Sequence, residues 1–179
     1  MDPIVNNCIL QVIETKSPLS TLRARSGENR YVPGVTEGPP ERRSACPISF
    51  ALDILGDRWT LLVVRDLVFA GKRNFQDFLA SPEKIATNIL ANRLARLEQA
   101  GVVTRRRDAS HVRRVDYSLT PKGLDLIPVL LELIRWGATH DPETAAPAAI
   151  VRRIEHDRDG FAAELRAAAL ARHTLASPR

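Results

Sequence analysis

Residues 81–114 constrain the fold more than any other part of the chain, because an amphipathic helix pattern runs directly into a basic, strand-like segment there. Eight Lys and Arg residues stand against three acidic residues in this window, a local net charge of +5. The whole chain also carries a net charge of +5, so the remaining residues sum to zero. Positive charge concentrated in this way indicates a surface that binds a polyanion.

Residues 87–100 are predicted to form a helix that ends at Gly101, a residue type that commonly terminates helices. Apolar side chains recur at helical spacing and define its buried face: Ile89, Leu90, Leu94 and Leu97. The opposite face carries small and amide side chains, which let a helix enter a DNA major groove and pair with base edges. The candidate DNA-contacting residues of this helix are Thr87, Asn88, Ala91, Asn92 and Arg96. Arg93 lies at the rim of the apolar face, where we expect it to brace the fold rather than contact DNA.

Residues 102–119 alternate in the manner of two strands, with Val115, Tyr117 and Leu119 on one face. The connection at 108–110 has no glycine in a tight-turn position, so we expect a loop of several residues. A helix with a free polar face followed by a basic hairpin is typical of a winged helix-turn-helix, a DNA-binding fold. Arginines near the hairpin tip are expected to contact the DNA backbone or the minor groove: Arg107, Arg113 and Arg114.

Three helices are predicted before residue 87. Pro47 suits the first position of the first helix, and Asp57 suits the N-cap of the second. The second helix is apolar on two sides, so we expect it to be the central and most buried one. Asn74 and Asp77 have the spacing of a capping box for a short third helix, which completes the helix-turn-helix.

After the hairpin, residues 121–136 are predicted to form one helix, capped by Thr120 and bent at Pro128. The helix carries two apolar stripes, more than a single small core can cover. We therefore expect a homodimer that uses the second stripe, which contains Leu126, Leu130 and Leu133.

The chain divides into three parts. Residues 1–45 contain five prolines and no sustained periodicity, so they are predicted to be a disordered N-terminal arm. Residues 46–140 form the winged-helix domain. Residues 141–179 form a linker and a C-terminal helical extension, with an amphipathic segment at 150–172 that is interrupted at Gly160. The expected fold class is mainly α (α+β): a winged helix-turn-helix with a two-stranded wing, flanking dimerisation helices and an extra C-terminal helix.

Composition argues against several other classes of protein. No run of apolar residues is long enough to span a membrane, and the N-terminus lacks the pattern of a signal peptide, so we expect a cytoplasmic protein. Two cysteines do not make a disulfide framework. The four histidines show no metal-ligand spacing, and no catalytic motif is present. We therefore expect no metal, no cofactor and no enzymatic activity.

Three segments together closely resemble the HxlR-type family of bacterial winged helix-turn-helix regulators: CPISFALDILGDRWTLLVVRDLVFAGKRNF, IATNILANRLARLEQAGVV and RRVDYSLTPKGLDLIPVLLELIRWG. The resemblance covers residues 46–141. It implies a homodimer joined by the first and last helices of the domain, which binds a double-stranded operator. It also implies regulation of nearby promoters, and we expect a repressor.

The same resemblance singles out Cys46, which corresponds to a cysteine that some relatives use to sense oxidants or electrophiles. A helix N-terminus favours the reactive thiolate, and the alternative is a small buried thiol without a redox role. Two positions depart from the family pattern. The wing tip at 110–113 lacks the usual prolines, and Ala86 replaces a Ser or Thr, so Thr87 is expected to cap the helix instead.

Two other functions fit parts of the pattern. A winged helix can serve as a protein-interaction module whose basic face is merely solvated, and salt-sensitive retention on DNA would distinguish the two. An RNA-binding protein would usually need several aromatic side chains for base stacking, whereas the wing has only Tyr117, which lies on the face with Val115 and Leu119. The sequence does not identify an operator or a small-molecule effector.

Overall fold

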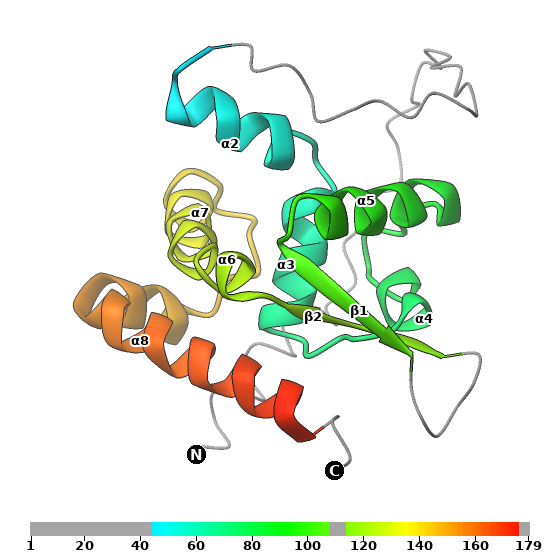
Figure 1. Ribbon diagram of the computed structural model, residues 1–179. Helices are drawn as coiled ribbons and strands as arrows, with labels where there is room; N and C mark the ends of the chain where they lie inside the picture. Colours follow the sequence, from blue (N-terminus) through cyan, green and yellow to red (C-terminus); the bar gives the residue numbers. More distant parts are fainter. Residues whose placement is uncertain (1–43, 108–113, 176–179) are drawn as a thin grey trace.

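The computed structural model describes residues 44–107 and 114–175 (Figure 1). Most of the predicted arm, residues 1–43, therefore lies outside the described residues. The elements are α2 (Pro47–Leu55), α3 (Thr60–Val68), α4 (Phe75–Leu79), α5 (Thr87–Gln99), β1 (Val103–Arg107), β2 (Val115–Leu119), α6 (Pro121–Leu124), α7 (Ile127–His140) and α8 (Ala148–Leu175). Helices with one antiparallel two-stranded sheet confirm the predicted winged helix-turn-helix.

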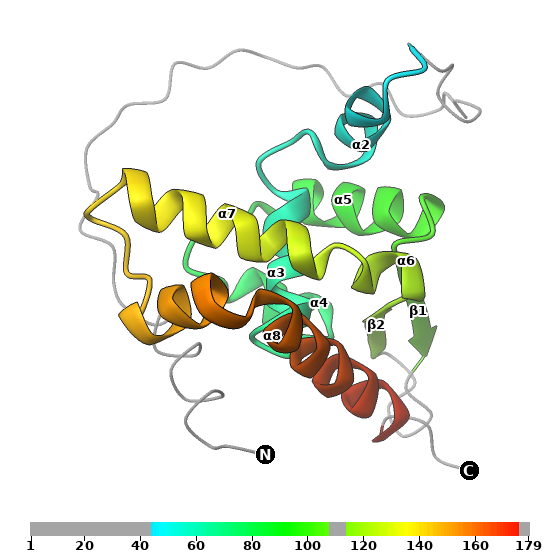
Figure 2. The same ribbon diagram turned by 90° about the vertical axis from the view of Figure 1, so that its left-hand side faces the viewer.

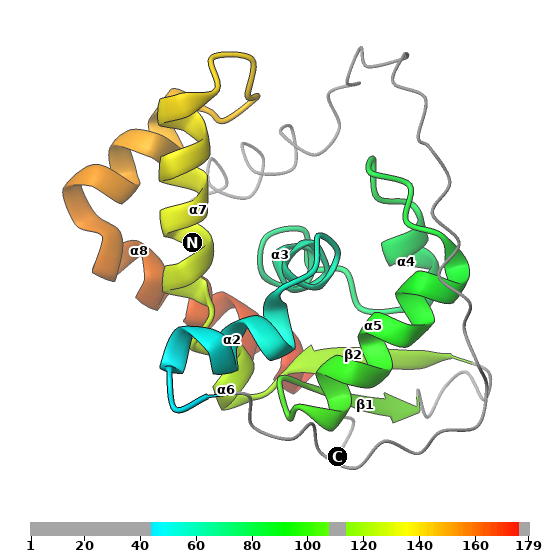
Figure 3. The same cartoon turned by 90° about the horizontal axis from the view of Figure 1, so that it is seen from above.

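Helix α3 lies at the centre of the domain, as its two apolar sides predicted. In Figure 3, α7 lies on one side of α3, and α4 and α5 lie on the other. Val64 and Val68 are almost completely buried, and Val63 and Leu67 are buried beside them. The free energy gained by burying these side chains positions the predicted DNA-binding elements around α3.

Side-chain hydrogen bonds form at the starts of α3 and α4. The N-cap of α3 is Trp59, two residues after the predicted Asp57, and it makes no side-chain cap of its own. The Asp57 carboxylate accepts hydrogen bonds from the amides of Trp59 and Thr60, at 2.8 and 3.0 Å. Asn74 and Asp77 form the predicted capping box at the start of α4. Each cap satisfies backbone donors that the first turn of a helix leaves without partners.

The ends of α5 are asymmetric. At its C-terminus the amide of Gly101 donates to Glu98 O and the amide of Val102 to Leu97 O, a Schellman motif that requires the positive φ of 68° at Gly101. At its N-terminus the N-cap is Ala86, which offers no side-chain hydrogen bond. The expectation that Thr87 caps the helix is wrong, because Thr87 already has its place in the first turn.

The predicted single helix over 121–136 is wrong, since the structure has two helices, α6 and α7, separated at residues 125–126. Pro128 provides the reason: in an uninterrupted helix its ring would clash with the carbonyl of Leu124 and its nitrogen could not donate. In the first turn of a new helix neither problem arises. The predicted Thr120 cap is confirmed, because its hydroxyl accepts a hydrogen bond from the amide of Gly123 at 3.1 Å.

Helix α8 is longer than predicted and breaks three residues before Gly160. Asp157 has non-helical angles (φ −151°, ψ 60°), and its carboxylate accepts a hydrogen bond from the amide of Gly160 at 3.1 Å. Asp157 thus acts as an N-cap for the second half of the helix. Figure 2 shows α8 running alongside α7 and continuing past it towards the sheet.

The apolar stripe chosen for self-association is largely used within the chain itself. Leu130 is buried, with 5% of its surface exposed, and Leu126 is half-buried in the core. Only Leu133 of that stripe is exposed. The choice of Leu130 as an interface residue is therefore wrong, because α8 and α3 pack against α7 and cover that side.

Candidate nucleic-acid interface

Helix α5 presents the polar face that the sequence predicted. Leu90, Leu94 and Leu97 are buried at 0–1% exposure and hold the helix against the core. All five candidate contact residues of this helix are exposed on the opposite face: Thr87, Asn88, Ala91, Asn92 and Arg96. A small alanine between two amides leaves room for a groove wall to approach the helix closely.

Arg93 braces the fold, as predicted from its place at the rim of the apolar face. Its Nη1 donates to Oδ2 of Asp57 at 2.8 Å. Burial alone would raise the pKa of Asp57. Hydrogen bonds from the Thr60 hydroxyl and the Trp59 amide, together with the charge of Arg93, outweigh burial and lower this pKa below its usual range.

Arg96 is exposed but is also oriented towards the preceding helix. Its Nη2 lies 3.4 Å from the backbone carbonyl oxygen of Asp53 in α2. This is a long hydrogen bond, and it leaves the other guanidinium donors of Arg96 available to a phosphate or a base. Arg93 and Arg96 thus connect α5 to the α2–α3 region by two separate contacts.

The wing is a regular antiparallel ladder whose outer end is basic. Arg105 pairs with Tyr117 and Arg107 with Val115 in the register of β1 and β2. Arg105, Arg106 and Arg107 are exposed, and so is Arg114, which also pairs with Asp116 at 3.1 Å. Arg113 and the rest of the tip, residues 108–113, lie outside the described residues.

At its inner end the wing is anchored in the core. Val103 and Leu119 are paired and buried, and Tyr117 packs edge-on against Phe78 of α4, with ring centroids 6.3 Å apart. The face of β2 that was predicted from Val115, Tyr117 and Leu119 is therefore the inward one. Because α5 packs against β1 and α4, the wing and α5 are held on one frame.

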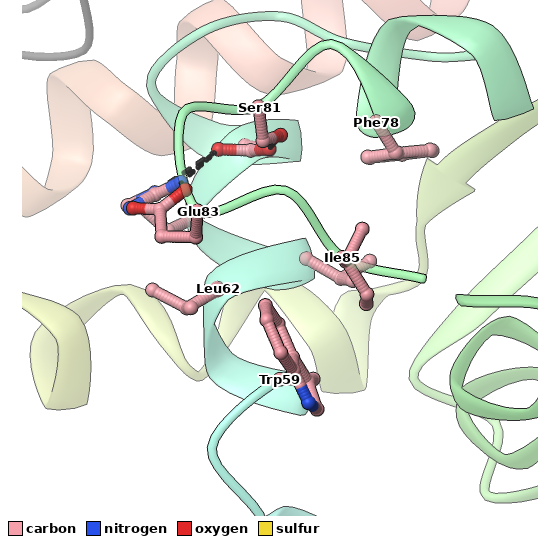
Figure 4. A pocket seen from close by; sticks show the side chains of 9 residues that line it. Trp59, Leu62, Phe78, Ser81, Glu83 and Ile85 are labelled. Carbon is pink, nitrogen blue, oxygen red and sulfur yellow. Dashed lines mark hydrogen bonds and ion pairs between the residues drawn. The ribbon is translucent and has the colours of Figure 1, made fainter. Parts of the chain in front are cut away.

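A cluster of charged side chains fixes the turn that leads into α5, and sequence reasoning missed it. Asp66 is buried, and it accepts hydrogen bonds from Arg65 Nε at 3.0 Å, from Lys72 Nζ at 3.1 Å and from the Ser81 hydroxyl. Arg65 also donates from Nη2 to Glu83 at 3.0 Å. Figure 4 shows Ser81 and Glu83 at the polar end of a small pocket, with Trp59 and Leu62 towards its apolar end.

Lys84 is a further basic residue of this turn that the sequence did not single out. It is exposed and has a φ of 53°, in the left-handed region that disfavours residues with a side chain. The surrounding cluster holds the turn in this conformation. Only the local charge count pointed to Lys84, because its backbone angle depends on the folded turn: its amide donates to the Ser81 carbonyl at 3.0 Å, Glu83 before it pairs with Arg65, and Ile85 after it is buried.

Cys46 occupies the N-cap position of α2 and is exposed, so the alternative of a buried thiol is wrong. Its amide donates to the Ser44 hydroxyl at 3.2 Å. Within the described ranges, no cluster of three or more His, Cys, Asp or Glu side chains is arranged to hold a metal ion. Across the same ranges, no helix has both the length and the apolar character needed to cross a membrane.

The fold, the free polar face of α5 and the basic wing define a winged helix-turn-helix DNA-binding regulator. A model of the HxlR-like helix-turn-helix family matches residues 54–145. The chain belongs to this family.

Similar proteins agree with this assignment. An uncharacterized HTH-type transcriptional regulator of Synechocystis sp., sll1512, is 36% identical over 93 residues, which cover 52% of this chain and 68% of the relative. The uncharacterized HTH-type regulator YvaP of Bacillus subtilis is 38% identical over 92 residues, which cover 51% of this chain and 84% of YvaP. The crystal structure of PA1607 superposes with a TM-score of 0.51 at 36% identity, over 56% of this chain and 68% of that one.

Proposed function

We propose that this DNA-binding regulator acts as a homodimeric, sequence-specific repressor, with α5 reading the major groove and the wing contacting the backbone or the minor groove. The observation that carries the proposal is the exposed face of α5, where Asn88 and Asn92 lie one turn apart beside a wing rich in arginine. Amides can pair with an adenine edge and guanidinium groups with phosphates, so one surface supplies both specificity and affinity.

The homodimer is supported by apolar side chains left exposed on two helices. Ile48 and Leu52 of α2 are 69% and 55% exposed, and no residue of α2 is buried within the chain. Val129, Leu133 and Trp136 of α7 are 43%, 47% and 60% exposed. Apolar surface of this extent favours association, and a two-fold dimer would present two α5 helices to successive half-sites of an operator.

Repression follows from the simplest use of such a dimer, because occupying promoter DNA requires no surface beyond the DNA interface. Footprinting on the DNA beside its own gene would locate an operator. A reporter driven by that promoter should then become more active when the gene for this protein is deleted. A fall in reporter activity would instead assign an activator.

The direct test of the DNA interface is a titration of the full chain on operator and scrambled duplexes at several salt concentrations. Binding should weaken steeply as salt increases, because binding releases cations from the duplex and the entropy gained by this release falls as the salt concentration rises. Tight, salt-sensitive binding with a preference for the operator supports the proposal. Binding that is absent at low salt would leave the protein-interaction module as the better description.

An effector acting at Cys46 is a second part of the proposal. The thiol is exposed at the start of α2, the helix that carries the exposed Ile48 and Leu52. The contact between Arg96 and Asp53 joins α2 to α5. Modification of Cys46 should therefore alter operator binding. Diamide should lower operator affinity of the native chain but not of Cys46→Ser, and equal responses would leave Cys46 without a sensing role.

A further inference from the structure

Helix α8 lies beyond residues 54–145, the segment that matches the family, yet it packs into the same core. Its apolar side chains are buried against α7 and α3: Ile150, Ile154, Phe161 and Leu165, at 9%, 3%, 1% and 6% exposure. The burial of Phe161 and Leu165, both beyond the break at Asp157, means that the second half of α8 is also held firmly. The last turns of α8 are thereby directed towards the wing.

The end of α8 is tied to the connection between α3 and α4 by two hydrogen bonds. Arg172 Nη2 donates to the carbonyl oxygen of Val68, at the end of α3, over 2.6 Å. Arg73 Nη1 donates in return to the carbonyl oxygen of Arg172 over 2.9 Å. Burial lowers the pKa of the Arg172 guanidinium, and the nearby charge of Arg73 adds to this effect. This arginine therefore lies in a defined site rather than in bulk solvent.

Gly71 gives the connection between α3 and α4 a left-handed turn beside Arg172. Its φ is 62°, and a Cβ atom at this position would lie 3.4 Å from Cδ of Arg172. A side chain here would be strained by the backbone angle, and its Cβ would lie in van der Waals contact with the arginine stem. The connection between α3 and α4 is thus shaped to receive Arg172.

The same connection holds the inner strand of the wing. The carbonyl oxygen of Arg73 accepts a hydrogen bond from the amide of Tyr117 over 2.7 Å, and Asn74 forms an isolated bridge with Asp116. Arg73 therefore lies between α8 and β2 and bonds to both. Leu67, Tyr117, Ala169 and Arg172 line one small pocket at this junction, and Figures 1 and 3 show the end of α8 beside α3 and β2.

We propose that α8 braces the wing and that Arg172 is a positioning residue for DNA binding. Arg172 holds the 69–74 connection against the end of α3, and this connection fixes β2, which leads to Arg114 and the outer end of the wing. The inference rests on the proposed contact between the wing and DNA. Without the brace, β2 loses its support on the side away from β1, and the wing no longer meets a duplex at a fixed angle to α5.

The test compares Arg172→Ala with Arg166→Ala in the full chain. Arg166 is the matched control because it also lies on the second half of α8, where it pairs with Asp125 at the surface at 2.8 Å. Hydrogen exchange of the Tyr117 amide measures the brace without DNA, and the amide of Leu94 in α5 reports global unfolding. Arg172→Ala should accelerate exchange at Tyr117 by about tenfold relative to Leu94, as expected for the loss of one charged hydrogen bond. Arg166→Ala should leave this ratio unchanged.

The second measurement is affinity for a duplex of random sequence at several salt concentrations. Arg172→Ala should bind several-fold more weakly. The slope of log affinity against log salt concentration should become less steep by roughly one unit, because a wing–phosphate contact is lost. Arg172→Lys keeps a donor for Val68 O, so it should recover part of the lost affinity and part of the lost salt dependence. If Arg172→Ala does not fold, Arg172→Gln, whose shorter side chain does not reach Val68 O, replaces it.

An unchanged exchange ratio at Tyr117 overturns the brace, and so does weaker DNA binding with an unaltered salt dependence. If Arg172→Ala exchanges faster at Tyr117 but the native chain does not bind DNA, the brace is supported and the proposed function is overturned. The two failures are therefore distinguishable.

Discussion

Nη1 of Arg93, on α5, donates a hydrogen bond to Oδ2 of Asp57 over 2.8 Å and across 36 positions of the chain. The same carboxylate accepts hydrogen bonds from the amides of Trp59 and Thr60 at the start of α3. One aspartate thus bonds both to the start of the central helix and to the helix that carries the proposed DNA-binding face. The conformation of the α2–α3 connection and the placement of α5 are consequently linked.

Removing either partner should destabilise the chain more than removing an exposed neighbour. Arg93→Ala leaves the Asp57 carboxylate without its cation, and we expect a loss of about 1–3 kcal/mol in the free energy of unfolding. Arg58→Ala, an exposed arginine next to Asp57, is the control and should change little. Urea denaturation of Arg93→Ala, Asp57→Asn and the double variant should show a coupling of about 1 kcal/mol or more. Strict additivity would mean that the ion pair adds no stability.

Asn88→Ala and Asn92→Ala should each weaken binding to the operator by about 1–3 kcal/mol and change binding to scrambled DNA little, because a base-pairing amide acts only on its own base pair. Arg107→Ala should weaken binding to both duplexes similarly. It should also make the slope of log affinity against log salt concentration less steep by about one unit. Arg152→Ala, an exposed arginine on α8, controls for charge alone. Equal losses on operator and scrambled DNA in the asparagine variants would show that α5 does not read sequence.

Leu133→Glu should give folded monomers that bind operator weakly, because a charge would be buried in the proposed dimer interface. Leu130→Ala should instead lower the free energy of unfolding by about 2–5 kcal/mol, as Leu130 fills the core of its own chain. Sedimentation and circular dichroism distinguish the two effects. Leu170→Glu introduces the same charge at another exposed leucine and should remain dimeric. A dimer retained in Leu133→Glu would exclude this face of α7.

Acid should release the ion pair that holds the turn before α5. The hydrogen bond from Arg65 lowers the pKa of Glu83, and this outweighs the effect of burial. A carboxylate whose pKa is lower in the folded state contributes stability above its unfolded pKa and loses it as pH falls through the folded value. The difference in unfolding free energy between the native chain and Glu83→Gln should therefore be full near neutrality, begin to fall near the unfolded pKa of about 4.3, and vanish only below the lower pKa of the folded state.

The magnitude of this difference should be modest. The Glu83 side chain is 33% exposed, and solvent screening limits such a pair to about 1 kcal/mol or less. Measuring the unfolding free energy of both chains from pH 3 to 7 checks the sign and the window. A difference that grows as the pH falls would contradict the assignment of Glu83 to Arg65.

Much of the fold follows from interactions between residues that are close in the sequence. Asn74 and Thr120 were identifiable as caps because a side chain must reach only two or three residues along the chain. The exposed face of α5 was readable because helical spacing alone separates Asn88 and Asn92 from the leucines. The pairing of β1 with β2 followed from alternation within a single hairpin.

Contacts between distant residues were decided only when the helices packed. Arg93 was recognised as a brace, but its partner Asp57 depends on how α5 lies against the start of α3. The sequence pattern placed Leu130 on an exposed apolar stripe, but in the folded chain it is buried, because α8 and α3 pack against α7. The hydrogen bond between Arg172 and Val68 joins residues 104 positions apart in the sequence. No local pattern encodes such a pair, because the burial that makes it favourable exists only in the folded chain.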